Sequence, residues 1–196
     1  MTETGVTRDL MRSAEIKQIV RSAYAAVDSS SEQLACKLYS PEELARMPQS
    51  AIERALGVGN HLRHAEIDAG ETLLDLGCGA GIDTILAAQR TGPTGRVIAL
   101  DFLPEMLERT TTAAAEAGVD TIEPLEGDIE AIPLADDSVD HVISNGVINL
   151  APRKARVLAE CARVLRPGGK LTVADLTVDD EELPTEILAH PATWAG

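Results

Sequence analysis

The chain contains few aromatic and few basic side chains. Aromatic residues make up only 2% of its 196 residues, with one Trp, two Tyr and one Phe. So few rings cannot build an aromatic cage for a quaternary amine or a platform for stacked bases. The 17 basic residues stand against 32 acidic ones, which gives a net charge of −15. Repulsion at this charge argues against DNA, RNA and anionic membranes as partners.

Cysteines and long apolar runs are also scarce. Three cysteines without an evident pairing suit a reducing compartment. No apolar run approaches the ~20 residues needed to cross a bilayer. The polar residues 1–9 lack the charged-then-apolar plan of a secretory signal. We therefore expect a cytoplasmic protein with no membrane partner, whose length allows one substantial core.

A glycine-rich stretch is the most informative part of the sequence. Leu73 to Leu76 reads as a buried strand that contains Asp75, and Gly77, Gly79 and Gly81 follow at alternate positions before a helical run. Because glycine has no Cβ, a ligand can touch the backbone of such a turn directly. The N-terminus of the following helix offers free N–H groups to a carboxylate or phosphate.

An acid closes the next strand-like segment. Asp101 follows the apolar run Arg96 to Leu100. It lies about 20 residues beyond the last glycine, where a doubly wound fold places a carboxylate that binds ribose hydroxyls. The alternative is a helix N-cap, because Pro104 stands at a plausible first helical position.

A second acid follows a third strand-like segment, residues 122–125. Asp128 can accept a hydrogen bond from an adenine amino group while Ile129 covers the face of the ring. The alternative is an ordinary turn Asp that bonds its own backbone. Farther along, Val139 to Leu150 reads as a central strand that runs into a polar loop. Within Val164 to Val173 a helix ends, a Pro-Gly-Gly turn reverses the chain and a fifth strand begins.

A nicotinamide dehydrogenase is the natural competing interpretation. Its fingerprint G-x-G-x-x-G requires glycine at the sixth position, which is Ile82 when counted from Gly77. Asp75 also stands just before the glycines, where its charge would repel a pyrophosphate. An ammonium group suits that carboxylate better.

The glycine loop, the ribose acid and Gly127-Asp128-Ile129 together resemble the binding site of class I S-adenosylmethionine-dependent methyltransferases, from about Glu71 to Leu176. The resemblance implies an α/β fold, namely a Rossmann-like doubly wound sheet of five parallel strands, with S-adenosylmethionine as cofactor. The cofactor-binding residues it implies are Asp75, Gly77, Cys78, Gly79, Gly81, Asp101, Phe102, Met106, Asp128, Ile129, Ser144 and Asn145.

Within that superfamily the chain is similar to the arsenite methyltransferases, which hold trivalent arsenic on cysteine thiolates. The similar segments are Ser144 to Leu150, Tyr39 to Ala45, Leu56 to Asn60, Glu182 to Pro184 and Trp194 to Gly196. The resemblance implies methyl transfer to a small, soft acceptor.

The cysteines match that family only in part. Cys36 corresponds to an N-terminal cysteine of the family and is the candidate arsenic ligand, whereas Val58 and Gly146 stand where the family has cysteines. Cys161 reads as a small buried hydrophobe on a helix. Cys36 and Asn145 are the candidate catalytic residues. Asn145 either orients the acceptor or bonds loop backbone.

The chain divides into three parts. Residues 1–68 are expected to form a helical lid, with helices over residues 9–27, from Ser40 with a capping box, and over residues 50–56. Residues 69–178 form the cofactor-binding core. Residues 179–196 make a truncated C-terminal segment, so that the usual antiparallel strands are missing. Either the chain is a fragment of a longer protein, or its fifth strand is an exposed edge. Truncation is expected to make the isolated chain unstable or oligomeric, for example a homodimer.

Histidines provide few candidate bases. His141 is expected to be structural or at the surface, His61 and His64 to decorate a helix surface or reach the cleft, and His190 has no derived role. Three functions remain open. The favoured one is methyl transfer to arsenic or another soft acceptor, such as a thiol. The others are an O- or N-methyltransferase of a small metabolite and a non-catalytic S-adenosylmethionine-binding remnant.

Overall fold

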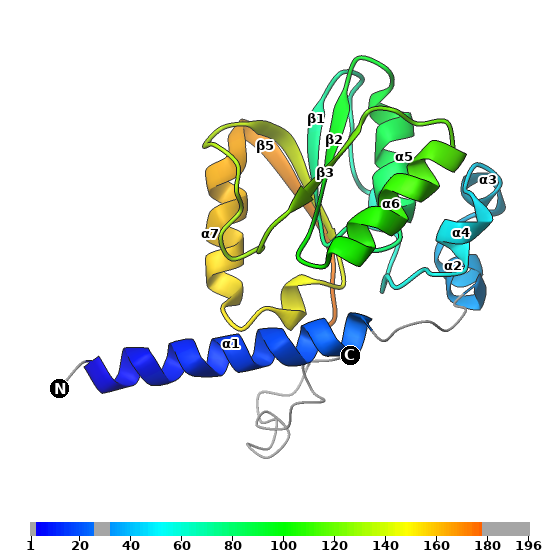
Figure 1. The fold of residues 1–196 in the computed structure, drawn as a ribbon. Helices are drawn as coiled ribbons and strands as arrows, with labels where there is room; N and C mark the ends of the chain where they lie inside the picture. Colours follow the sequence, from blue (N-terminus) through cyan, green and yellow to red (C-terminus); the bar gives the residue numbers. More distant parts are fainter. Residues whose placement is uncertain (1–2, 26–31, 178–196) are drawn as a thin grey trace.

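Five parallel strands form the centre of the molecule. The computed structural model describes residues 3–25 and 32–177. The strands run in the order β3-β2-β1-β4-β5 (Figure 1). This confirms the predicted doubly wound sheet. Their bounds are β1 Thr72–Leu76, β2 Arg96–Asp101, β3 Ile122–Glu126, β4 Val139–Asn145 and β5 Leu165–Ala174.

Helices cover both faces of this sheet. Helices α5 (Ile82–Thr91) and α6 (Pro104–Glu116) lie on one face, and α7 (Lys154–Val164) lies on the other (Figure 1). Leu73 on β1 belongs to the core cluster beneath α5, and its neighbour Leu74 belongs to the cluster beneath α7. Side chains alternate along a strand, so an apolar run is what a sheet buried on both faces requires.

The chain changes direction across the sheet beside β1. From β1 it proceeds outward to β2 and β3, and it then returns to place β4 on the other side of β1. The loops after β1 and β4 therefore diverge to opposite faces. They leave a crevice at the carboxyl ends of the strands, where ligands of doubly wound folds bind.

Four helices precede the sheet. They are α1 (Glu3–Ala25), α2 (Glu32–Leu38), α3 (Pro41–Leu44) and α4 (Gln49–Ile52), and α1 lies across the carboxyl ends of the strands (Figure 1). The capping box is confirmed, because the Ser40 side chain accepts from the Glu43 N–H while the Glu43 carboxylate accepts from the Ser40 N–H. The helix expected over residues 50–56 is shorter, since regular hydrogen bonding ends at Ile52.

The Pro-Gly-Gly segment differs from the prediction. It lies within β5 as an irregularity and does not form a separate turn between α7 and that strand. Pairing with β4 jumps from Val139 opposite Leu165 to His141 opposite Lys170. Gly168 permits this because its φ of +85° falls in the left-handed region.

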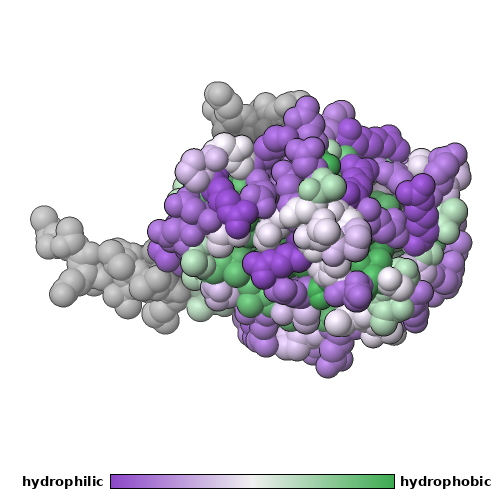
Figure 2. All heavy atoms as spheres, turned by 90° about the horizontal axis from the view of Figure 1, so that it is seen from above, coloured by the Kyte–Doolittle hydropathy of each residue, from purple (hydrophilic) through white to green (hydrophobic). Residues whose placement is uncertain are grey.

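The far side of the molecule is mostly polar. Figure 2, which looks onto the face opposite α1, shows hydrophilic side chains over most of the surface with scattered apolar atoms. Within the described part, β5 is an edge strand, and Leu171, Val173 and Leu176 near it are exposed. No helix among the described residues has the length and apolarity to cross a membrane. The expectations for residues 179–196 and His190 lie outside the described residues.

Candidate functional site

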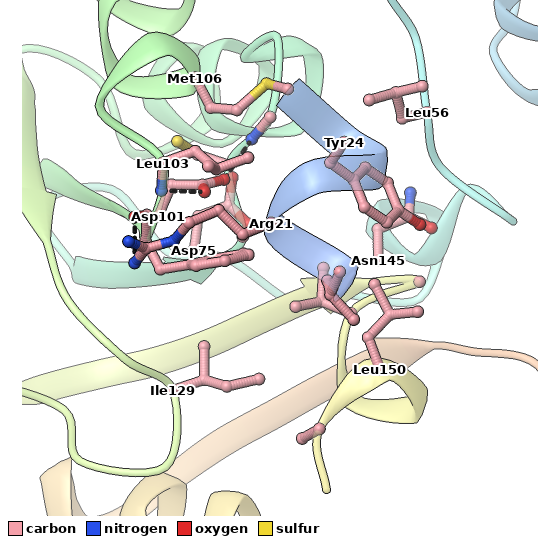
Figure 3. A pocket seen from close by; sticks show the side chains of 18 of the residues that line it. Arg21, Tyr24, Leu56, Asp75, Asp101, Leu103, Met106, Ile129, Asn145 and Leu150 are labelled. Carbon is pink, nitrogen blue, oxygen red and sulfur yellow. Dashed lines mark hydrogen bonds between the residues drawn. The ribbon is translucent and has the colours of Figure 1, made fainter. Parts of the chain in front are cut away.

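A cavity of about 710 Å³ opens at the carboxyl ends of β1, β2, β3 and β4. Its walls are the glycine loop after β1, the segments that follow the other three strands, and one side of α1 (Figure 3). This volume lies within the range of small-molecule sites, about 300–1,000 Å³. The crevice expected from the strand order is therefore present as a cavity.

Most of the predicted site residues lie in this cavity, and two do not. Ser144 is fully buried in β4, and among the described residues its hydroxyl has no hydrogen-bond partner. Cys36 lies on α2 with an exposed side chain and does not line the cavity. The predicted residues that line it are Asp75, Gly77, Cys78, Gly79, Gly81, Asp101, Phe102, Met106, Asp128, Ile129 and Asn145.

The glycine loop is held in a shape that side chains would disturb. Gly77 has a φ of +71°, and a Cβ on it would lie 2.5 Å from a methyl group of Val147. Gly79 has a φ of +54°, but a Cβ there would meet no atom within 4 Å. The backbone at Gly79 thus faces open space, which is what direct contact with a ligand requires.

Asp101 ties the glycine loop to the loop after β2. Its carboxylate accepts from the Gly79 N–H at 3.2 Å and from the Leu103 N–H at 3.0 Å. Leu103 is the N-cap residue of α6, so the N-cap alternative for Asp101 is wrong. Burial raises the pKa of Asp101, while the backbone N–H groups act in the opposite direction.

Asp128 makes the turn contact that was its alternative interpretation and also lines the cavity. One carboxylate oxygen accepts from the Glu130 N–H at 2.8 Å, and the other pairs with the Lys17 ammonium at 2.5 Å. Lys17 also pairs with the buried Glu130 at 2.6 Å. Arg153 makes a third ion pair at 2.9 Å, again with Glu130. The two ion pairs of Lys17 fasten α1 to the loop after β3, and the pair of Arg153 joins that loop to the start of α7.

Six residues of α1 line the cavity, among them Lys17, Arg21 and Tyr24, and none of the six was a predicted site residue. The Arg21 guanidinium lies 5.4 Å from the centre of the Phe102 ring and donates to the Phe102 carbonyl oxygen at 3.4 Å (Figure 3). Their spacing of four and three residues places them on one face of a helix. That spacing is the sequence pattern from which these cavity-lining residues could have been predicted.

Carboxylates dominate the wall beside the glycine loop. Asp75 is only 2% exposed and accepts from the Thr84 hydroxyl at 2.6 Å. Burial and the neighbouring Asp83 raise the pKa of Asp75 to about 8. A cationic group bound here would favour the ionised form of these carboxylates, because it supplies the opposite charge that they lack.

The side-chain amide of Asn145 forms hydrogen bonds with other groups of the protein. The amide oxygen accepts from the N–H groups of Val58 and Gly59, and the amide nitrogen donates to the Gly59 carbonyl and to Asp83. Of the two alternatives for Asn145, the structure therefore has the one in which its side chain bonds loop backbone. Asp83, which was not among the predicted site residues, lines the cavity beside Asn145.

Among the described histidines, His61 differs from the expectation of a helix surface, whereas His64 and His141 agree with theirs. His61 lies in a short 3-10 helix (His61–Arg63) and is only 3% exposed, while His64 is exposed. His141 is fully buried in β4, and one of its ring nitrogens lies 2.8 Å from the Thr172 hydroxyl. Burial lowers the pKa of both buried histidines. None of the three lines the cavity.

Comparisons with known proteins agree on one family. A family model described as a methyltransferase domain matches residues 67–195. An arsenite methyltransferase of Halobacterium salinarum is 41% identical over 168 residues, which is 86% of this chain and 42% of that protein. One of Aquipseudomonas alcaligenes is 37% identical over 138 residues, or 62% of this chain and 40% of that protein. The chain therefore spans less than half the length of these relatives.

A solved structure gives the same result. The crystal structure of CrArsM, an arsenic(III) S-adenosylmethionine methyltransferase from Chlamydomonas reinhardtii, is 39% identical and superposes with a TM-score of 0.71. The similarity covers 78% of this chain and 53% of that one.

The carboxylate of Asp75 provides a stability test. Its pKa is about 8 in the folded protein and 3.8 in the unfolded chain, so the folded state binds more protons between these values and stability falls as pH rises through this window. D75N removes this dependence and keeps an oxygen that can accept from Thr84. We expect D75N to raise the melting temperature at pH 8 by ~4 °C or more, and by less at pH 5.

The matched control is D120N, which changes an exposed carboxylate. Melting curves of the three proteins between pH 4 and 9 provide the measurement. A constant difference between D75N and the parent across this range would mean that Asp75 titrates normally.

Proposed function

The chain belongs to the methyltransferase domain family, and we propose that it binds S-adenosylmethionine in the cavity at the carboxyl ends of the strands and transfers the methyl group to a small acceptor. The observation that carries this proposal is the line of carboxylates beside an exposed glycine backbone. Asp75, Asp101 and Asp128 all line one cavity and lie near the carboxyl ends of three successive strands, Asp75 within β1, Asp101 as the last residue of β2 and Asp128 just after β3.

Each carboxylate suits a different part of that cofactor. Asp75 stands two residues before Gly77 in the sequence and would hold the ammonium group. Asp101 would accept hydrogen bonds from the ribose hydroxyls. Asp128 would accept from the adenine amino group, with Ile129 against the ring. Asp128 is paired with Lys17 in this structure, so that contact would rearrange or be shared when adenine binds.

The protein's contribution to the reaction is alignment. S-adenosylmethionine supplies a methyl group that is already activated on a sulfonium. The cavity walls would place the acceptor on the far side of that methyl, in line with the sulfur. Helix α1 covers the cavity and would exclude water during the transfer.

We infer that the acceptor is a soft atom, arsenic or a thiol-type sulfur, on the strength of the similarity to arsenite methyltransferases. A Cβ built on Gly146 would lie 3.8 Å from the Cβ of Val58, so the two positions where that family has cysteines are neighbours here as well. A soft nucleophile needs little help from a base, and this agrees with a cavity that none of the histidines in the described ranges lines.

One observation favours an oxygen or nitrogen acceptor as a second candidate. Val58 and Gly146 offer no thiolate, and Cys36 does not line the cavity. Release of S-adenosylhomocysteine during turnover of an arsenic-free acceptor would support this candidate. Cofactor binding with no turnover against a broad panel of acceptors would instead indicate a non-catalytic binding protein.

The ribose contact gives a direct test of the proposed function. D101A should weaken S-adenosylmethionine binding by roughly 1–3 kcal/mol, about 5- to 150-fold, because charge-assisted hydrogen bonds are lost. Isothermal titration calorimetry measures this, with D120A as the control for a lost surface charge. Equal affinities of D101A and the parent protein would refute the ribose contact.

The acceptor inference has its own test. V58C together with G146C should raise the affinity for arsenite at least ~10-fold, because neighbouring thiolates suit a soft trivalent ion. G146C alone should destabilise the protein by about 1–2 kcal/mol, since position 146 has a left-handed backbone. In that single variant the new Cβ would also lie 3.0 Å from a Val58 methyl group.

Calorimetric titration with arsenite compares the double variant with and without C36S, which shows whether Cys36 contributes. No gain in affinity for either protein would mean that positions 58 and 146 do not correspond to arsenic ligands.

A further inference from the structure

A buried carboxylate connects three separate parts of the chain beside the cavity. Asp83, in the first turn of α5, accepts from the Tyr39 hydroxyl at 2.9 Å and from the Asn145 amide at 2.8 Å. The His61 ring lies near it, with its Nδ1 atom 4.0 Å from the carboxylate. Neither ring nitrogen of His61 has a hydrogen-bond partner among the described residues.

This carboxylate is costly for the fold. The Asp83 side chain is only 12% exposed, and the hydrogen bonds that it accepts come from a phenol and an amide, both neutral. Burial raises the pKa of Asp83, because removal from water disfavours the charged form of the carboxylate. Perturbed carboxylates in clefts mark candidate functional positions, because an uncharged acceptor could make the same bonds at lower cost.

Asn145 links Asp83 to the segment that precedes the sheet. Its amide oxygen lies 2.8 Å from the Val58 nitrogen and 3.2 Å from the Gly59 nitrogen, and its amide nitrogen lies 2.8 Å from the Gly59 oxygen. With the bond to Asp83, both donors and both acceptor positions of the amide are used. A bound acceptor would therefore have no free group of Asn145 to contact.

The clamped segment forms one wall of the cavity. Leu56 and Gly57 line it, and so do Gly146 and Val147 beside them. A Cβ on Gly57 would lie 2.4 Å from the Asn145 amide nitrogen, so the backbone and the amide are in close contact there. The clamp thus holds two neighbouring segments of the cavity wall against each other.

We propose that Asp83 and Asn145 are positioning residues that fix residues 56–59 against the end of β4 and thereby set the acceptor end of the site. The inference rests on the proposed function, because that function makes this end of the cavity the acceptor end. Asp101 and Asp128 lie on other loops, so the proposed nucleoside contacts should not depend on the clamp.

A pair of introduced thiols can report the position of the clamped segment without knowledge of the acceptor. The Cβ separation of 3.8 Å between Val58 and a Cβ built on Gly146 falls within the range of disulfides, about 3.5–4.5 Å. The background protein is C36S/V58C/G146C, in which the remaining cysteines, Cys78 and Cys161, are buried. The rate of disulfide formation in oxidised glutathione is followed by mass spectrometry.

In this background, D83A and N145A should slow disulfide formation at least ~10-fold, because the effective concentration of one thiol near the other falls. D83N should retain most of the rate, since its amide oxygen can still accept from Asn145. Y39F should give an intermediate rate. N149A is the matched control, an asparagine four residues beyond Asn145 that does not line the cavity, and it should leave the rate unchanged.

Adenosine affinity is measured on the same proteins and should stay within ~3-fold of the background protein, because adenosine uses the proposed contacts of Asp101 and Asp128 and lacks the ammonium group assigned to Asp75. Unchanged disulfide rates in both D83A and N145A would overturn the proposal, and so would a parallel loss of adenosine affinity, which would assign the cluster to the nucleoside. If the background protein does not bind S-adenosylhomocysteine but the rates fall as expected, the proposed function fails and the clamp stands. Should D83A not fold, N145A and Y39F still decide the outcome.

Discussion

Buried negative charge at the carboxyl edge of the sheet is the constraint on which the rest of the structure depends. Parallel strands bring their ends together, so the acids that follow them share one low-dielectric cavity. Asp75, Asp83 and Asp101 are all buried there, and burial raises the pKa of each. Such a wall is stable when a positive ligand lies against it. This electrostatic property fits a sulfonium amino acid better than a dinucleotide with its anionic pyrophosphate.

Helix α1, which covers the cavity, carries two of the cationic side chains that line it. Lys17 contacts the loop after β3, and Arg21 contacts the loop after β2. Both loops belong to the expected nucleoside end of the site. Helix α1 is therefore fastened to the same loops that a bound nucleoside would touch, so closure of the cavity and occupation of the nucleoside end involve shared groups.

The two ends of the cavity are built from different elements. The nucleoside end uses the loops after β2 and β3, whereas the other end joins the end of β4 to residues 56–59 through Asn145. Acceptor preference can then change while the cofactor contacts remain. The combination of a well-matched glycine loop with Val58 and Gly146 in place of the cysteines expected from the resemblance is consistent with such a separation.

The sequence by itself determined the strand–helix alternation, the glycine loop, the capping box at Ser40 and the acids after β2 and β3, because these follow from local periodicity and backbone chemistry. Only the tertiary structure decided the contacts between distant segments: Lys17 meets Asp128 across 111 positions, and Tyr39 meets Asp83 across 44. It also decided the irregularity within β5, the burial of His61 and the full use of the Asn145 amide. Such contacts depend on how whole elements pack together, and no local pattern encodes that packing.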